Sequence, residues 1–343
     1  MSENESFKHD GIILEPFHYL LANSGKGLRR QLIKAFNFWM QIPAEKLELL
    51  SEVIEMLHNA SLVIDDIEDG SSRRRGKPAA HMLFGIPMSI NAANYAYFLA
   101  LEKVLALGHP DVPLIFAEQM LDLHRGQGLD IYWRCSCNCP SEPAYEDMVI
   151  KKTGGLFGMA VKFMQLFSAD KRDFTPLLEI LGLWFQVRDD LANLVDQSYH
   201  DLKDFADDLT EGKFSYPVVH AINAQPHDHQ VLSILRQRTS EYTVKEYCIG
   251  LLADMGSLDH TAKKLVKLET QCRNIVAELG GNSHLEAFLS EFSSIYRSPS
   301  GEPRTFEHLS FKGKNFSHMK PVSSGDCSSR VQDCLNNHQN SSS

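Results

Sequence analysis

Hydrophobic residues recur at helical spacing through most of this 343-residue chain. Apolar positions three and four apart predict helices, because at 3.6 residues per turn they share one face. No stretch of any length alternates apolar and polar residues with the period of two that is typical of strands. We therefore expect a nearly all-helical fold. The segments with this pattern are residues 13–21, a helix opening at Leu28, and residues 47–64, 89–107, 112–131, 145–168 and 177–186.

The segment 47–64 leads directly into Asp65-Asp66-Ile67-Glu68-Asp69, where four of five residues carry carboxylates. On a continuous helix Asp65 and Asp69 share one face, whereas Asp66 lies about 100° away. Two carboxylates one turn apart repel by about 3 kcal/mol at an effective dielectric near 20, and a cation removes that cost. Oxygen ligands of this kind suit Mg²⁺. The alternative interpretation is a solvated acidic helix end.

A second acidic pair repeats this construction. The apolar segment 177–186 leads into Asp189-Asp190, and Asn193 supplies an oxygen four positions after Asp189. Two apolar helices that both end in Asp-Asp are hard to explain as two solvated faces. Facing carboxylates on two helices are able to hold metal ions and one diphosphate between them. The pattern therefore favours a metal site for a phosphate-bearing substrate.

Basic residues stand close to the predicted helix ends. Lys26 and Arg29 flank the start of the helix at Leu28, where free backbone N–H groups also attract anions. A second basic cluster at residues 73–77 follows the first acidic motif. Simple charge balance explains this cluster, and so does a polyanion held between metal ions and guanidinium groups. The adjacent Gly154 and Gly155 indicate a helix break or a close backbone approach.

Composition narrows the class of protein. The net charge of −10 argues against nonspecific nucleic-acid binding, and the 43% hydrophobic content allows a large core. Cys135, Cys137 and Cys139 lack a second Cys or His pair, which favours a reduced loop over a zinc site.

We expect no signal peptide, no membrane span and a cytoplasmic protein. Residues 298–343 are rich in Ser, Asn and Gly and predict a disordered tail after one domain of residues 1–297.

These motifs occur in the order found in the trans-isoprenyl diphosphate synthases, and residues 13–292 most closely resemble the eukaryotic geranylgeranyl diphosphate synthases. The resemblance implies a single-domain bundle of antiparallel helices around a deep central cavity, the isoprenoid synthase fold, assembled as a homodimer or homohexamer. The implied activity is Mg²⁺-dependent condensation of isopentenyl diphosphate with dimethylallyl, geranyl or farnesyl diphosphate to make geranylgeranyl diphosphate. The resemblance rests on Gly25-Lys26-x-x-Arg29, His58, the first acidic motif, Arg74-Arg75-Gly76, residues 124–128 and 152–155, Gln186, Asp189-Asp190-x-x-Asn193 and residues 208–213.

Carried over residue by residue, the resemblance places Mg²⁺, as three ions per active site, on Asp65, Asp69 and Asp189. Lys152 and Lys213 join these aspartates in stabilising the leaving diphosphate. The implied contacts to the allylic substrate are Arg74, Lys152, Thr153, Gln186, Lys203 and Lys213. The implied contacts to the diphosphate of isopentenyl diphosphate are Lys26, Arg29, His58 and Arg75. Asn193 stands where the family's second motif usually ends in Asp, which leaves its role as a ligand open.

Product length is predicted from the residues one turn before the metal site. Ala60 and Ser61 are small, whereas short-chain members of the family carry an aromatic residue near this point. Ser61 lies four residues before Asp65, so a growing chain should pass it. The open path predicts a twenty-carbon product. The resemblance suggests Tyr97, Phe98 and His124 as the floor of the cavity, although all three are equally explained as ordinary core residues.

Three other functions stay open. A noncatalytic subunit of a prenyl synthase heteromer typically loses an Asp of one motif, and both motifs are intact in this chain. A short-chain synthase would make geranyl or farnesyl diphosphate. A terpene cyclase would not need a second diphosphate site, for which Lys26, Arg29, His58 and Arg75 are present.

Overall fold

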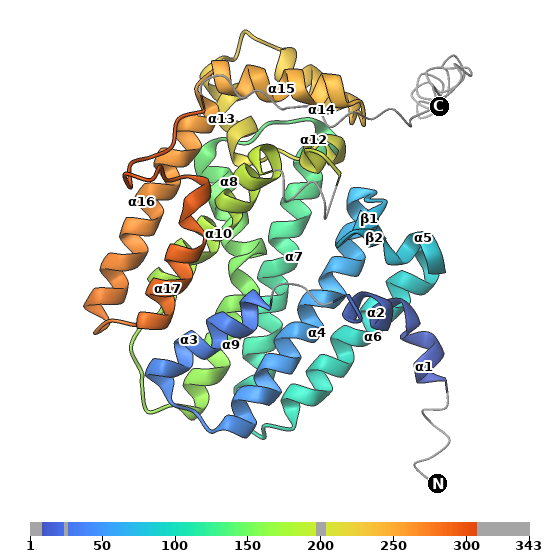
Figure 1. The fold of residues 1–343 in the computed structure, drawn as a ribbon. Helices are drawn as coiled ribbons and strands as arrows, with labels where there is room; N and C mark the ends of the chain where they lie inside the picture. Colours follow the sequence, from blue (N-terminus) through green and yellow to red (C-terminus); the bar gives the residue numbers. More distant parts are fainter. Residues whose placement is uncertain (1–8, 24–26, 197–203, 307–343) are drawn as a thin grey trace, which may run out of the picture. The chain divides into compact units, whose positions relative to one another are not determined.

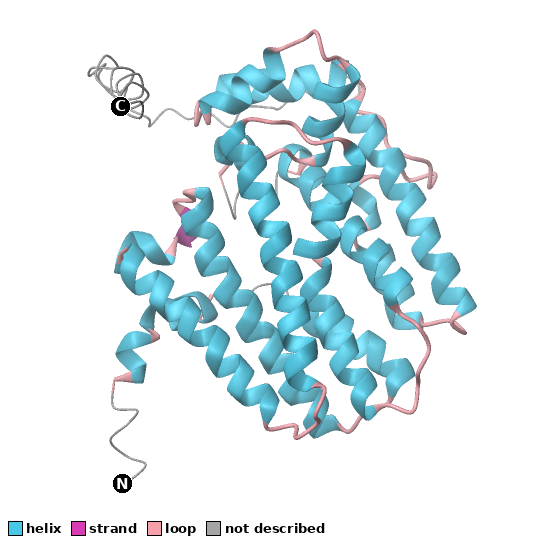
Figure 2. Cartoon of the chain, turned by 180° about the vertical axis from the view of Figure 1, so that it is seen from behind, coloured by secondary structure: helices cyan, strands magenta, loops and turns pink. Residues whose placement is uncertain are grey.

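Helices make up almost all regular structure in the computed structural model, which describes residues 9–23, 27–196 and 204–306. The long helices lie side by side (Figures 1 and 2), which confirms the all-helical expectation. The helices are α1 (Asp10–Ile13), α2 (Glu15–Leu21), α3 (Leu28–Met40), α4 (Ala44–Asp69), α5 (Ala80–Phe84), α6 (Ile86–Leu105), α7 (Val112–Ser136), α8 (Glu142–Lys152), α9 (Gly154–Phe167), α10 (Thr175–Val195), α12 (Asp207–Glu211), α13 (Tyr216–Ala224), α14 (Gln230–Gln237), α15 (Tyr242–Asp254), α16 (Ser257–Glu278) and α17 (Ser283–Glu291). A 3₁₀ turn, η1 (Ser293–Ile295), follows, and β1 (Arg73–Arg74) pairs antiparallel with β2 (Lys77–Pro78).

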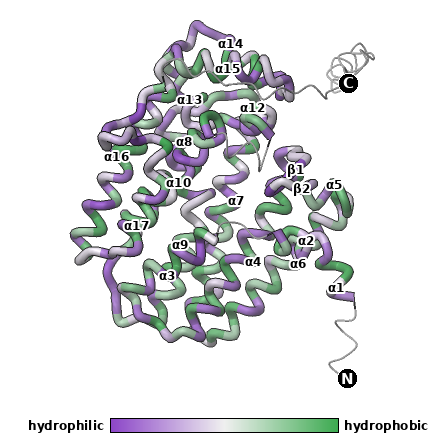
Figure 3. The backbone as a smooth tube through the Cα atoms, in the orientation of Figure 1, coloured by the Kyte–Doolittle hydropathy of each residue, from purple (hydrophilic) through white to green (hydrophobic). Residues whose placement is uncertain are grey.

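Helix α4 carries the first acidic motif and packs against α2, α3, α6 and α9. Its apolar face is fully buried, with Leu50, Val53, Ile54 and Leu57 at 0% exposure. Burying each such side chain contributes about 1.5–3 kcal/mol, which fixes the helix that leads to the acidic residues. Hydrophobic and hydrophilic positions alternate along the helices in Figure 3, as expected for helices with one buried face.

Helix α4 continues through the acidic motif, which lies inside its last two turns, as the shared face of Asp65 and Asp69 required. Gly70 ends it with a φ of 69°, a left-handed conformation that glycine adopts without strain. The Ser71 backbone N–H then donates to the Asp66 carbonyl at 2.9 Å. This reversal turns the chain into the β1–β2 hairpin, which brings Arg74 back alongside the motif.

The break expected near the paired glycines is present. Helix α8 ends at Lys152 and α9 begins at Gly154, so Thr153 joins the two helices. The second acidic pair lies within α10, which packs against α8, α9 and α16. The break thus places Lys152 and Thr153 at a helix junction beside α10.

The folded part of the chain continues beyond the domain boundary predicted at residue 297. Arg297 forms a bridge with Pro303, and Phe306 is 3% exposed with its backbone N–H donating to Asp259 at 2.8 Å. The rest of the predicted tail, residues 307–343, lies outside the described residues. No helix in the described segments has the length and apolar character needed to span a membrane.

Candidate active site

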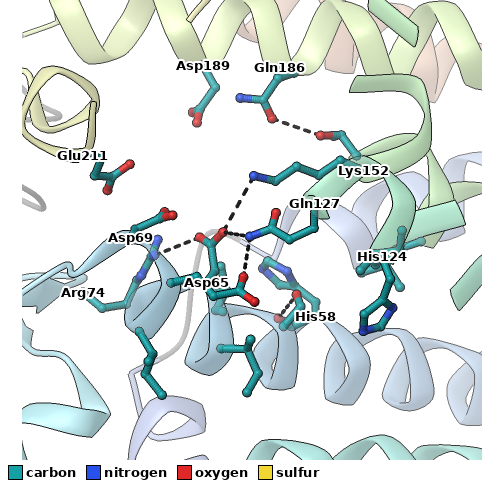
Figure 4. A pocket seen from close by; sticks show the side chains of 18 of the residues that line it. His58, Asp65, Asp69, Arg74, His124, Gln127, Lys152, Gln186, Asp189 and Glu211 are labelled. Atoms are coloured by element: carbon teal, nitrogen blue, oxygen red, sulfur yellow. Dashed lines mark hydrogen bonds and ion pairs between the residues drawn. The ribbon is translucent and has the colours of Figure 1, made fainter. Parts of the chain in front are cut away.

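A cavity of about 1140 Å³ opens between the long helices. Asp189 on α10 points across it toward Asp65 and Asp69 on α4 (Figure 4). Two predicted substrate contacts, Lys26 and Lys203, lie outside the described residues. The predicted site residues that line the cavity are Arg29, His58, Ser61, Asp65, Asp69, Arg74, Arg75, Tyr97, His124, Lys152, Thr153, Gln186, Asp189 and Lys213.

The two neighbouring aspartates of the first motif have different surroundings. Asp65 lines the cavity, where its Oδ1 accepts from Gln127 Nε2 at 3.2 Å and lies 3.8 Å from Lys152 Nζ. Asp66 is 1% exposed, and its Oδ1 accepts from Arg74 Nε at 2.7 Å. The rotation of about 100° per residue explains this division. One carboxylate faces the cavity, and the next one holds Arg74 in position.

The second motif divides in the same way. Asp189 lines the cavity, whereas Asp190 is fully buried. Asp190 accepts from the backbone N–H of Tyr216 at 2.8 Å, from Lys213 Nζ at 3.2 Å and from the Tyr145 hydroxyl. Its role is therefore to hold Lys213 and the start of α13 in place.

Asn193 does not continue the parallel between the motifs. It is 5% exposed and does not line the cavity, in contrast to Asp69 at the matching position of the first motif. Its Oδ1 accepts from the Asp208 backbone N–H at 3.3 Å. The side-chain oxygen of Asn193 is thus used inside the fold rather than presented to the cavity.

A close helix contact positions Lys152. A Cβ at Gly126 of α7 would lie 2.5 Å from the Lys152 backbone nitrogen, so any larger residue there would displace the end of α8. Lys152 Nζ donates to Asp130 Oδ2 at 2.6 Å. Burial opposes the charged form of Lys152, but Asp130, Asp65 and Asp69 outweigh it and raise its pKa. Lys152 therefore stays an ammonium group facing the acidic residues.

Among the described residues, several carboxylates lie close together at the acidic end of the cavity. Burial, with the nearby carboxylates of Asp65 and Glu211, raises the pKa of Asp69 well above its ordinary value. The contact from Arg134 Nη1 to Asp69 Oδ1 offsets only part of this effect. A divalent cation would relieve the remaining repulsion, and hard carboxylate oxygens are the ligands that Mg²⁺ prefers.

A second group of cavity residues, Arg29, His58 and Arg75, brings positive charges together and forms the basic end. Burial and the charge of Arg75 lower the pKa of Arg29 to about 10. Burial, followed by the charges of Arg29, Arg75 and Arg74, lowers the pKa of His58 well below its ordinary value. The buried Nε of Arg29 has no hydrogen-bond partner among the described residues. Guanidinium groups that crowd one another in this way are suited to bind an anion such as a diphosphate.

Comparison with known proteins identifies the family. Residues 10–252 match the family model described as polyprenyl synthetase. The chain belongs to the polyprenyl synthetase family. This confirms the resemblance to the trans-isoprenyl diphosphate synthases, and the helical bundle is the isoprenoid synthase fold of that family.

Similar members of the family carry two kinds of name. The chain is 53% identical over 282 residues to a protein of Matsumurasca onukii named terpene synthase, covering 82% of this chain and 93% of that protein. It is 46% identical over 290 residues to the geranylgeranyl pyrophosphate synthase of Dictyostelium discoideum, covering 84% and 96%. It is 48% identical over 280 residues to geranylgeranyl pyrophosphate synthase spyE of Aspergillus fumigatus, covering 82% and 78%.

Two of the five chain-length residues do not line the cavity. Ala60 is 0% exposed and packs in a core cluster with Ala92, Ala93 and Ala96. Phe98 is 69% exposed and lies outside the lining. The sequence analysis had assigned adjacent residues, Ala60 with Ser61 and Tyr97 with Phe98, to the same cavity. Adjacent residues of a helix point about 100° apart, so two of them rarely face one cavity.

Sequence reasoning missed several residues that shape the site. Gln127 Nε2 donates to both Asp65 and Glu68, which joins α7 to α4. Glu211 and Asp208 also line the cavity. Glu211 lies two positions before Lys213, a predicted substrate contact. This short spacing could have predicted that Glu211 also belongs to the site. The partners Asp130 and Arg134 lie far from the acidic motifs in sequence, and no local pattern indicates their contacts.

Proposed function

We propose that this chain is a Mg²⁺-dependent prenyltransferase that condenses isopentenyl diphosphate with an allylic diphosphate and releases geranylgeranyl diphosphate. One observation carries the proposal. The lining of a single cavity includes both an acidic group, Asp65, Asp69 and Asp189, and a basic group, Arg29, His58 and Arg75, which we call its acidic end and its basic end. Two diphosphate substrates need two such ends, one that binds through metal ions and one that binds directly.

The three cavity aspartates fit Mg²⁺ chemically. They offer hard oxygen ligands, and burial with the neighbouring carboxylates of Asp65 and Glu211 raises the pKa of Asp69. Within the described residues they do not bring one oxygen each to within 4.8 Å of the others as a compact group. This spacing supports ions that bind one or two carboxylates each and complete their coordination with water and substrate phosphate, as Mg²⁺ usually does. Three ions per site is the arrangement that we propose.

The reaction needs charge stabilisation and protection from water. Bound Mg²⁺ would supply positive charge to the diphosphate as the allylic C–O bond breaks. Lys152 and Lys213 line the same end and would stabilise the leaving diphosphate as its charge rises. The basic end would hold isopentenyl diphosphate so that its double bond bonds to the allylic carbon, and the released diphosphate would accept the proton whose loss forms the new double bond. No protein nucleophile is required.

The path for the growing chain runs from the acidic end past Ser61. Ser61 lies on α4 one turn before Asp65, and it lines the cavity together with Tyr97 and His124. The rings of Tyr97 and His124 meet edge to face at 6.2 Å. A small residue at position 61, with this ring pair farther along, supports a product longer than farnesyl diphosphate. We propose Tyr97 and His124 as the floor that limits growth at twenty carbons.

A terpene synthase is the second candidate function, because a relative with 53% identity carries that name. Such an enzyme would convert one diphosphate into a hydrocarbon or alcohol and would not need the basic end. The presence of Arg29, His58 and Arg75 in the cavity favours condensation.

Product analysis separates the two functions. Purified protein with Mg²⁺ is supplied with isopentenyl diphosphate and each allylic diphosphate in turn, and separately with each allylic diphosphate alone. We expect geranylgeranyl diphosphate in the first set and no product in the second. A hydrocarbon or alcohol that forms without isopentenyl diphosphate would establish the terpene synthase instead.

We also propose that the chain forms homodimers or homohexamers. Large apolar side chains are exposed on α6 and α7, with Leu105 at 45%, Leu114 at 60% and Leu121 at 55% exposure. Contiguous exposed apolar surface marks interaction sites, and we propose that these two helices carry the interface. Light scattering of the native chain should give a mass of two or six chains, and Leu121→Glu should lower that mass. A native monomer would contradict the proposal.

A further inference from the structure

A cluster of one carboxylate and two imidazoles lies apart from the cavity residues. Glu142 is the first residue of α8, His220 lies on α13, and His260 lies on α16. Helix α13 packs against both other helices (Figure 1). One ligand atom from each side chain lies within 4.8 Å of the other two, and this is the sole group of its kind among the described residues. His260 Nε2 is already 3.2 Å from Glu142 Oε1.

The surrounding contacts orient two of the three side chains. The Tyr216 hydroxyl donates to Glu142 Oε2 at 2.7 Å, which fixes that carboxylate. His220 Nδ1 lies 2.9 Å from Ser257 Oγ. With Nδ1 donating to this hydroxyl, Nε2 keeps its lone pair and is available as a ligand. Hydrogen bonds of this type commonly hold the histidine and carboxylate ligands of protein metal sites.

The charges near the cluster also favour a cation. In the part of the chain that the structure describes, Glu142 forms an ion pair only with His260. The nearest equivalent pair, Lys264 Nζ to Glu146 Oε1 at 2.6 Å, lies one turn farther along the same two helices and leaves Glu142 without an ammonium partner. Burial, followed by the neighbouring His260, lowers the pKa of His220 and so disfavours the protonated form of this imidazole. A neutral imidazole is the form that binds metals.

We propose that Glu142, His220 and His260 form a binding site for a divalent transition metal of the Zn²⁺ class. Two imidazoles and one carboxylate match the ligand preference of Zn²⁺, Co²⁺ and Ni²⁺ rather than that of Mg²⁺. The set leaves a fourth position for water, with the Tyr216 hydroxyl nearby. The bound ion would tie α8, α13 and α16 together.

Binding requires a defined rearrangement. The rings of His220 and His260 are stacked, with centroids 3.9 Å apart and planes 21° apart. In a tetrahedral site with bonds of about 2.0–2.1 Å, the ligand atoms lie roughly 3.4 Å from one another. Both rings must therefore turn until their nitrogen lone pairs converge on one point. The χ2 torsion of histidine has a broad energy minimum, so the torsion itself opposes this rotation only weakly.

Added Zn²⁺ can also bind at the cavity aspartates, so the experiment must separate the two sites. The sites are linked through the fold, because the Tyr216 backbone N–H donates to Asp190, whose neighbour Asp189 lines the cavity. Excess Mg²⁺ occupies hard oxygen sites but does not compete well for imidazole nitrogen. Excess Mg²⁺ thus suppresses Zn²⁺ binding at the cavity aspartates, and a comparison of untagged native protein with a cluster variant isolates the histidine cluster.

The test is calorimetric titration of Zn²⁺ into the native chain and into His260→Gln. The His260 side chain is 39% exposed, so this substitution should leave the fold intact, and a melting curve without Zn²⁺ checks that. We expect one Zn²⁺ per native chain and at least about a tenfold loss of affinity in the variant, since even an outer hydrogen-bond partner is worth 10–100-fold. His284→Gln, at a histidine outside the cluster, is the matched control and should bind as the native chain does.

Two further readouts test the same site. At a fixed Zn²⁺ concentration, the melting temperature should rise as much in His284→Gln as in the native chain, and clearly less in His260→Gln. The ring-proton resonances of His220 and His260 should shift on binding as the stack opens. Equal Zn²⁺ affinity in native and His260→Gln protein, or no binding in the presence of Mg²⁺, would overturn the proposal and leave the cluster as a hydrogen-bonded link between helices.

Discussion

The acidic and basic groups of the cavity differ in sign, and in each group burial and like charges disfavour the charged form of a side chain. At the acidic end, burial and neighbouring carboxylates raise the pKa of Asp69. At the basic end, burial and neighbouring guanidinium groups lower the pKa values of Arg29 and His58. Folding alone would not favour either arrangement. The comparison indicates a site that is completed by its ligands, with cations at one end and an anion at the other.

The two ends also differ in how their charges are held. At the acidic end, buried carboxylates position the basic side chains. Arg74 donates to Asp66, and Lys213 donates to Asp190. At the basic end, Arg75 Nη1 donates to the Asn23 carbonyl at 2.5 Å, and Arg29 stacks 5.6 Å from the Phe157 ring centre. Neutral partners hold the arginines without cancelling their charge. The basic end can therefore bind a diphosphate directly.

The largest expected effect comes from the acidic end. Asp65→Asn and Asp189→Asn should each lower turnover by at least about a hundredfold, the scale of losing one preorganised charged group. Steady-state assays with melting curves test this, and the fold should stay intact because both residues face the cavity. Asp147→Asn, on the exposed face of α8, is the control and should keep native turnover. Native rates from either cavity variant would show that the metal assignment is wrong.

A substitution at the basic end should weaken the binding of isopentenyl diphosphate alone. Arg29→Ala should raise the KM for isopentenyl diphosphate by about ten- to 150-fold, since a hydrogen bond to a charged group is worth about 1.5–3 kcal/mol. The KM for the allylic substrate should change much less. Arg30→Ala is the matched control, because Arg30 pairs with Glu48 at 3.0 Å away from the cavity. An equal rise in both KM values would mean that the two ends do not bind separate substrates.

The sequence predicted the acidic end more completely than the rest of the site. Charges that end an apolar helix are visible in a linear pattern, and helical geometry correctly separated Asp66 from the cavity pair. At the basic end, the local sequence predicted an anion site only at Lys26 and Arg29. The family resemblance was needed to assign His58 and Arg75 to the same site. Contacts between distant helices, such as Lys152 with Asp130, have no local signature. Gly126 belongs to a family motif, yet its packing against Lys152 appears only in the structure.

The chain-length path extends from the acidic end, and one substitution should shorten the product. Ser61→Phe should shift the main product from geranylgeranyl to farnesyl diphosphate, because overpacking of about 1–3 kcal/mol disfavours the longer chain by roughly five- to 150-fold. Ser61→Ala keeps the side chain small and should retain the twenty-carbon product. Chromatography of the dephosphorylated products measures the ratio. An unchanged twenty-carbon peak in Ser61→Phe would place the path elsewhere.

The smallest effect is expected from Asn193→Asp. The new carboxylate has the same shape and would still accept from the Asp208 N–H, so turnover should stay within about an order of magnitude of native. Because residue 193 does not line the cavity, this change should not rescue Asp189→Asn when the two are combined. Kinetics of the double variant check this point. Rescue would mean that residue 193 reaches the metal ions.

Binding of isopentenyl diphosphate without metal tests most directly whether the basic end alone holds this substrate. If it does, calorimetry in excess chelator should detect binding to the native chain and to Asp189→Asn. The same titration should show little or no binding to Arg29→Ala. If isopentenyl diphosphate instead binds only with Mg²⁺ present, and Asp189→Asn abolishes that binding, then both diphosphates use the acidic end and the division of the cavity into two substrate sites is wrong.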